Sequence, residues 1–183
     1  EVTDFSGRPL DRPPRRATWD AVSAEKGRYP HFMAKEIAEQ PSAVVETVGH
    51  KISLETGRFS EDAMGIPRDL LARVSRIQIA ACGTSWHAGL VAKFLLEEVA
   101  RVPTEVDYAS ELRYRAPVLG PDSLVIGVSQ SGETADTVAA LTEAKRNGVP
   151  TIGVVNVPGS AIARLVDGVL ATHAGPEIGV AST

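Results

Sequence analysis

The stretch LVIGVSQSGETADTVAALTEAKRNG, residues 124–148, decides the fold. An apolar segment typical of a buried strand ends in a cluster of serines and threonines around Gly132, and a helical pattern follows. The helix has Asp136 in its first turn, Arg146 in its last and Gly148 just beyond, so its ends complement the helix dipole and the C-cap. The stretch therefore predicts a strand, a loop and a helix in succession.

The same alternation recurs along the chain. Strands are expected over residues 75–81, 104–109, 123–129, 150–156 and 167–172, and helices over residues 85–101, 110–115, 134–148 and 159–165. The helix over 85–101 collects apolar side chains on one face, namely Leu90, Val91, Phe94, Leu95 and Val99. Short apolar strands that alternate with helices are typical of a parallel sheet covered on both faces. The sequence predicts an α/β fold, a doubly wound five-stranded parallel sheet flanked by helices.

The N-terminal part of the chain has a different character. Residues 1–20 are polar and proline-rich, which is typical of a linker or of a small hairpin around Ser6-Gly7. Residues 21–183 are expected to form the domain, with two helices ahead of the sheet. Pro41 is expected to end the first helix and to open the second. The apolar positions of these two helices are Phe32, Met33, Ile37, Val44, Val45, Val48 and Ile52.

Composition limits the function classes. The 183 residues are 43% apolar and carry a formal net charge of −4, which argues against nucleic acid as the main partner. No segment approaches the length of a membrane span, and no signal peptide is evident. The single cysteine, Cys82, excludes an internal disulfide and suits a cytoplasmic protein. Because the chain begins at Glu1 and stops at Thr183 without a closing helix, we interpret it as a piece of a longer protein.

The predicted sheet has one crevice for a ligand. In the common strand order 2-1-3-4-5, the order reverses between the first and third strands, and ligands bind at the carboxyl ends there. The loops that leave these strands, residues 81–89 and 129–137, both lead into helix N-termini, which favour phosphate. Their hydroxyls are neutral donors, and Gln130 is a candidate partner for sugar hydroxyls. The hydroxyl-bearing residues are Thr84, Ser85, Ser129, Ser131 and Thr134.

Three other interpretations are disfavoured. The segment GVSQS, residues 127–131, nearly matches a G-x-S-x-G nucleophile elbow, and Asp167 and His173 follow in the order of a hydrolase triad, but Ser131 stands where the second glycine belongs. The histidines are scattered and share no metal-ligand spacing with Cys82, so no metal is expected. A nucleotide is disfavoured as well, since neither a Walker sequence nor GxGxxG is present.

Four motifs in order, EKGRYPHFMAKEIAEQP, ACGTSWHAGLVAK, SQSGETADT and AGPEIGVAST, carry a resemblance that covers nearly the whole chain from Asp4. The sequence resembles the first sugar isomerase (SIS) domain of the glucosamine-6-phosphate synthases, which are glutamine–fructose-6-phosphate aminotransferases (isomerizing). Trp86 departs from the tyrosine more often seen in this family. The resemblance implies that the substrate is bound by Thr84, Ser85, Ser129, Gln130, Ser131, Thr134, Val180 and Ser182.

The resemblance also implies what this chain lacks. In the family, the catalytic residues belong to a glutaminase domain, a second SIS domain and a C-terminal tail, so no catalytic residue is expected here. We expect the chain to bind fructose 6-phosphate or glucosamine 6-phosphate without cofactor, and the full enzyme to be a homodimer. A non-catalytic sugar-phosphate sensing module and a SIS-type sugar-phosphate deaminase or isomerase stay open as alternatives. The linker-like residues 4–20 favour the synthase.

Overall fold

A five-stranded parallel sheet forms the centre of the computed structural model, which describes residues 3–11, 24–49, 51–53, 55–59 and 68–180. The strands are β1 (Arg76–Ala81), β2 (Thr104–Tyr108), β3 (Ser123–Ser129), β4 (Thr151–Val155) and β5 (Gly168–Ala171). Their order is β2-β1-β3-β4-β5, and every neighbouring pair is parallel. The predicted fold class is confirmed, and the strand order reverses between β1 and β3 as expected.

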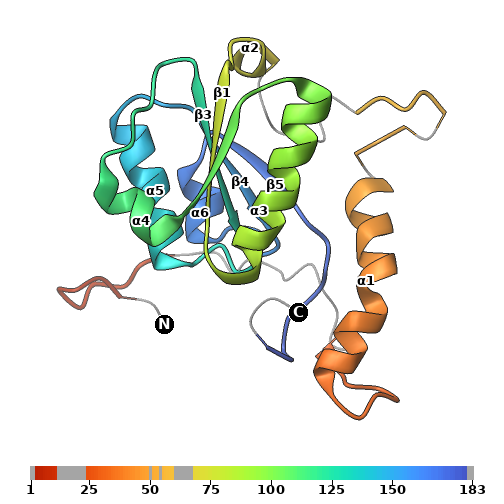
Figure 1. Ribbon diagram of the computed structural model, residues 1–183. Helices are drawn as coiled ribbons and strands as arrows, with labels where there is room; N and C mark the ends of the chain where they lie inside the picture. The colour runs from red at the N-terminus through yellow and green to blue at the C-terminus, as the bar shows by residue number, and fades with distance from the viewer. Residues whose placement is uncertain (1–2, 12–23, 50, 54, 60–67, 181–183) are drawn as a thin grey trace.

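Helices cover the two faces of the sheet unequally (Figure 1). One face carries α4 (Ala109–Arg115), α5 (Ala135–Arg146) and α6 (Ala161–Leu165), whose core includes the fully buried Val125, Leu141 and Ile162. The opposite face carries α3 (Gly83–Leu95), which continues as a π-helical turn, η3 (Leu96–Ala100), and packs over Ile77 and Ile79. The short α2 (Arg68–Leu71) precedes β1.

The apolar face expected on α3 is turned away from the sheet. Val91, Phe94 and Leu95 are 62%, 67% and 57% exposed, and Val99 of η3 is exposed as well. The helix meets the sheet through smaller residues, including Gly89, where a Cβ would lie 3.0 Å from side-chain atoms of Ile79 and Val106. Close approach of the helix to the sheet therefore selects a small residue there, and the larger apolar residues lie outside.

The prediction of two helices around Pro41 is wrong. One helix, α1 (Phe32–Gly49), runs through this proline. Proline lacks the N–H that would donate to the carbonyl of Ile37, but its fixed φ suits a helix. Both residues are exposed, so water can satisfy the carbonyl left unpaired. The helix lies apart from the sandwich, beside the segment that follows β5 (Figure 1).

The small hairpin expected near the N-terminus is present. Thr3 and Pro9 form an antiparallel bridge, and Gly7 takes the left-handed conformation at φ +81° in the turn. The Asp4 carboxylate accepts hydrogen bonds from the N–H groups of Ser6 and Arg8. Most of the remaining linker prediction, over residues 12–20, lies outside the described residues.

Candidate functional site

The loop after β3 is held in shape by its own hydroxyl groups. Ser129 is only 4% exposed, and its Oγ accepts a hydrogen bond from the N–H of Gly132 at 3.1 Å. The same oxygen lies 2.8 Å from Oγ1 of Thr134, in a hydrogen bond that either hydroxyl can donate. Ser131 Oγ accepts from the N–H of Glu133 at 3.2 Å. Ser129 therefore ties both ends of the turn together.

Neighbouring elements brace this loop from outside. The carbonyl of Gly132 accepts a hydrogen bond from the N–H of Ile162 in α6 at 2.9 Å. Glu133 Oε1 accepts from the N–H of Ala161 at 2.7 Å, so this carboxylate caps α6. The carbonyl of Gln130 accepts from the N–H of Asn156 just beyond β4. The loop is thus fixed to the neighbouring strand and helix.

Two helix N-termini lie at the carboxyl ends of β1 and β3. The N-cap of α3 is Cys82 and that of α5 is Thr134, and neither side chain makes a cap hydrogen bond. The hydroxyl of Thr134 is bonded to Ser129 instead. Neither N-cap side chain occupies the first-turn N–H groups, whose partial positive charge attracts anions.

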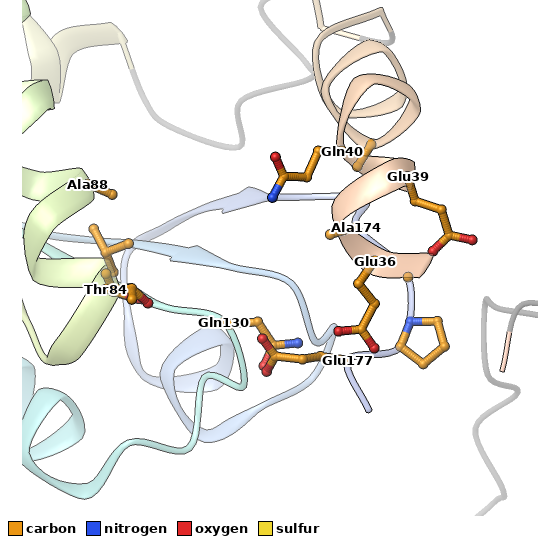
Figure 2. Close-up of a pocket in the computed structure, with 13 residues that line it drawn as sticks. Glu36, Glu39, Gln40, Thr84, Ala88, Gln130, Ala174 and Glu177 are labelled. Carbon is orange, nitrogen blue, oxygen red and sulfur yellow. The ribbon is translucent and has the colours of Figure 1, made fainter. Parts of the chain in front are cut away.

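The loops after β1 and β3 meet in a cavity of about 430 Å³. Figure 2 shows Thr84 and Gln130 on one side of this space and Glu36, Glu39 and Gln40 of α1 on the other. The described residues that line it are Glu36, Glu39, Gln40, Ala43, Thr84, Ser85, Ala88, Val128, Gln130, Ala174, Gly175, Pro176 and Glu177. The cavity lies where β1 and β3 adjoin, which is the crevice that the strand order predicts.

The predicted site residues fall into three groups. Thr84, Ser85 and Gln130 line the cavity, whereas Ser129, Ser131 and Thr134 build the adjoining loop without lining it. Val180 follows the segment that closes the cavity and is 48% exposed. Ser182 lies outside the described residues.

A second cavity, of about 530 Å³, adjoins the first on the side of β4 and β5. Both are lined by Gln130 and by residues 175–177. The side chain of Asn156 fixes the start of this shared wall, since it donates to the carbonyl of Gly175 at 2.7 Å and accepts from the N–H of Ala174 at 2.9 Å.

The disfavoured hydrolase triad does not form. Asp167 lies before β5, where its Oδ2 accepts hydrogen bonds from the N–H and hydroxyl of Thr151 at 2.9 and 2.8 Å, and its Oδ1 from Lys145 at 2.8 Å. Burial alone would raise the pKa of the Asp167 carboxyl, but these bonds outweigh it and lower the pKa. This amino end of the sheet is opposite to the end where Ser129 lies.

Sequence reasoning did not assign the α1 residues that form the far wall. The residues in question are Glu36, Glu39 and Gln40, which belong to no catalytic motif. The sequence indicated them only as part of the segment HFMAKEIAEQP, which contributes to the family resemblance. Trp86, which departs from the tyrosine of the resembled family, packs against a second aromatic residue. Its ring stacks on Tyr108 at the end of β2, with centroids 4.5 Å apart and planes 7° apart.

Within the described part of the chain, no cluster of three or more His, Cys, Asp or Glu side chains could hold a metal ion. The helices of this part are also too short or too polar to cross a membrane.

Comparisons with known proteins agree with this geometry. The family model of the SIS domain matches residues 70–183. The whole chain is 51% identical to the glutamine–fructose-6-phosphate aminotransferase (isomerizing) of Gloeobacter violaceus and 49% identical to that of Thermus thermophilus. It spans 30% of the length of each relative. Among solved structures, the C-terminal domain of glucosamine-fructose-6-phosphate aminotransferase from Francisella tularensis superposes with a TM-score of 0.81 and 44% identity. That match covers 87% of this chain and 44% of the other.

Proposed function

Because the chain belongs to the SIS domain family, we propose that its cavity binds a sugar 6-phosphate, with the phosphate at the N-termini of α3 and α5. One observation carries the proposal: neither N-cap side chain, Cys82 or Thr134, bonds to its own helix, and the first turn of α3 lines the cavity while α5 begins at the end of the loop that contributes Gln130 to it. Such N–H groups bind phosphate without a lysine or arginine.

The hydroxyl groups of the loop have different roles in this proposal. Ser129 Oγ accepts a hydrogen bond from the N–H of Gly132. When Ser129 also donates its hydroxyl proton to Thr134, the hydroxyl proton of Thr134 is free to bond to a phosphate oxygen. Ser131 and Thr84 supply further donors, and Ser85 and Gln130 line the route toward the sugar. Ser129 thus shapes the loop, while the other hydroxyls and the amides bind the ligand.

The charges around the cavity support one orientation of the ligand. Among the described residues, its lining contains the carboxylates Glu36, Glu39 and Glu177 and no lysine or arginine. A phosphate dianion is repelled by carboxylates, whereas sugar hydroxyls donate hydrogen bonds to them. The phosphate therefore lies toward α3 and α5, and the sugar extends toward α1 and residues 174–177.

We propose that this chain is the substrate-binding SIS domain of a glutamine–fructose-6-phosphate aminotransferase (isomerizing). The 51% identity over all 183 residues supports this choice over the sensing module and the deaminase. In this proposal the chain binds fructose 6-phosphate and glucosamine 6-phosphate but carries none of the catalytic residues. A homodimeric full enzyme and a cytoplasmic location stay predictions.

Titration of the labelled chain by NMR tests the proposal. Fructose 6-phosphate and inorganic phosphate should shift the amides of residues 129–134 and compete with each other. The double variant Ser131→Ala with Thr134→Ala should lose about 1.5–3 kcal/mol of binding free energy for each hydrogen bond to the charged phosphate. Thr142→Ala is the matched control, because that hydroxyl bonds to the carbonyl of Val138 within the same helix. Shifts confined to another region, or unchanged affinity in the folded double variant, would refute the site.

A further inference from the structure

The helix α1 is joined to the segment after β5 by hydrogen bonds to two of its side chains. Glu36 Oε1 accepts from the N–H of Ile178 at 2.8 Å and from the N–H of Gly179 at 2.9 Å. Near the C-terminal end of α1, Thr47 Oγ1 accepts a hydrogen bond from the N–H of His173 at 2.9 Å. The helix and this segment therefore form one wall of the cavity, although they are far apart in sequence.

The contact at Glu36 is a close one. A Cβ added to Gly179 would lie 2.7 Å from the backbone nitrogen of Met33 and 2.9 Å from Oε2 of Glu36. Only a residue without a side chain lets the segment approach α1 closely enough for both N–H groups to reach one carboxylate oxygen. The approach depends on Glu36 from one side and on Gly179 from the other.

The two ends of the segment have different anchors. Asn156, just beyond β4, holds Ala174 and Gly175 through its side-chain amide. Glu36 holds Ile178 and Gly179, the two residues directly before Val180. Figure 2 shows the Glu36 side chain extending from α1 toward the part of the segment that carries Glu177. Glu36 therefore controls the half of the segment that leads to the predicted sugar contacts.

We infer that Glu36 is a positioning residue. Its carboxylate fixes residues 177–180 across the cavity from residues 129–134, and these fixed residues form the binding site for the sugar end of the ligand. The inference rests on the proposed function for its ligand, but the hydrogen bonds at Ile178 and Gly179 are independent of it. Glu36 affects the sugar end of the ligand by holding residues 177–180 in place, whereas the phosphate end is bound by the N-termini of α3 and α5. Glu36 should therefore affect the binding of a sugar phosphate and not that of inorganic phosphate.

The first experiment compares ligand binding by the 183-residue chain and its variants. Glu36→Ala removes the acceptor of both N–H groups, so it should weaken the binding of fructose 6-phosphate by about tenfold and leave the binding of inorganic phosphate within about twofold. Glu36→Gln keeps a carbonyl acceptor and should restore most of the affinity. Gly179→Ala should reproduce the loss from the opposite side. Glu98→Gln on η3 is the charge control, since this exposed carboxylate is not among the described residues that line either cavity.

The second experiment, amide hydrogen exchange without ligand, separates failure of this inference from failure of the proposed function. The amides of Ile178 and Gly179 should be protected in the wild type and in Glu36→Gln, and exchange freely in Glu36→Ala. Unchanged protection in Glu36→Ala overturns the inference, as does equal weakening of both ligands or an equal effect of Glu98→Gln. If neither ligand binds the wild type at residues 129–134, the proposed function fails and the sugar role of Glu36 fails with it.

Discussion

Gly132 is the residue of the loop after β3, residues 129–134, at which a single methyl group should have the largest effect. Its φ of +65° lies in the left-handed region, which favours glycine. A Cβ at this position would lie 2.0 Å from Oγ of Ser160 and 2.6 Å from its Cβ. Rotation of the Ser160 side chain would relieve the overlap with Oγ but not the overlap with Cβ. The backbone of the loop, or the backbone at the N-terminus of α6, must therefore move.

The magnitude follows from two separate costs. The left-handed conformation costs an alanine about 1–2 kcal/mol. Overpacking of a well-filled site adds about 1–3 kcal/mol. Gly132→Ala should therefore lower the free energy of unfolding by about 2–5 kcal/mol, the sum of these ranges. The same shift would displace the turn that Ser129 ties to Gly132, and so weaken phosphate binding.

Urea denaturation followed by circular dichroism measures this effect, and Gly148→Ala is the matched control. Gly148 has φ +71°, yet beyond its two chain neighbours no atom of the described residues lies within 4 Å of its added Cβ, so it reports the conformational cost alone. Ser160→Gly in the Gly132→Ala background should restore the steric part. If Gly132→Ala costs no more than Gly148→Ala, or if Ser160→Gly restores nothing, the argument from close packing is refuted.

Two further predictions concern the sandwich. Asp167→Ala should destabilise the protein by about 1–3 kcal/mol, because the N–H and hydroxyl of buried Thr151 lose their charged acceptor. Since the pKa of Asp167 is lowered in the folded protein, its contribution is complete above the ordinary carboxyl pKa of 3.8 and is lost as the pH falls through the lowered value. Urea denaturation at several acidic pH values should show the wild type converging on the variant, and a constant difference would contradict this. Leu141→Ala, at a fully buried position, should cost about 2–5 kcal/mol, whereas Val45→Ala on the exposed face of α1 should change stability by less than about 0.5 kcal/mol in the same assay; equal losses would contradict the assigned burial.

The sheet could be predicted because its signal is local. The three central strands β1, β3 and β4 are largely apolar, and a parallel sheet buries both faces of such strands, so Ile79, Val125 and Ile152 identify their strands without reference to one another. The order of the strands followed from the common topology of such folds. The crevice between β1 and β3 then followed from the order, and the structure brings Thr84 and Gln130 to it.

The far wall of the cavity could not be predicted because its signal is tertiary. Pro41 is a helix breaker by its local chemistry, yet α1 continues through it, and the apolar residues of this helix do not mark a buried face. Glu36 and Gly179 are 143 residues apart, and nothing in either local sequence indicates that one carboxylate accepts the other's N–H. A contact of this kind becomes visible only when both segments have been placed.

The serines of the loop show the same limit at the scale of single atoms. Ser129 and Ser131 stand two residues apart in SQSGET, and as sequence letters they are equivalent hydroxyl donors. The structure separates them, because Ser129 is buried and bonded within the loop, while Ser131 is half-exposed and accepts only a neighbouring N–H in its own turn among the bonds described. Ser129 accepts one N–H and shares a hydrogen bond with the Thr134 hydroxyl, whereas none of the bonds described uses the proton of the Ser131 hydroxyl. In the proposed site, a variant of Ser129 should therefore affect the shape of the loop, and a variant of Ser131 should affect phosphate binding.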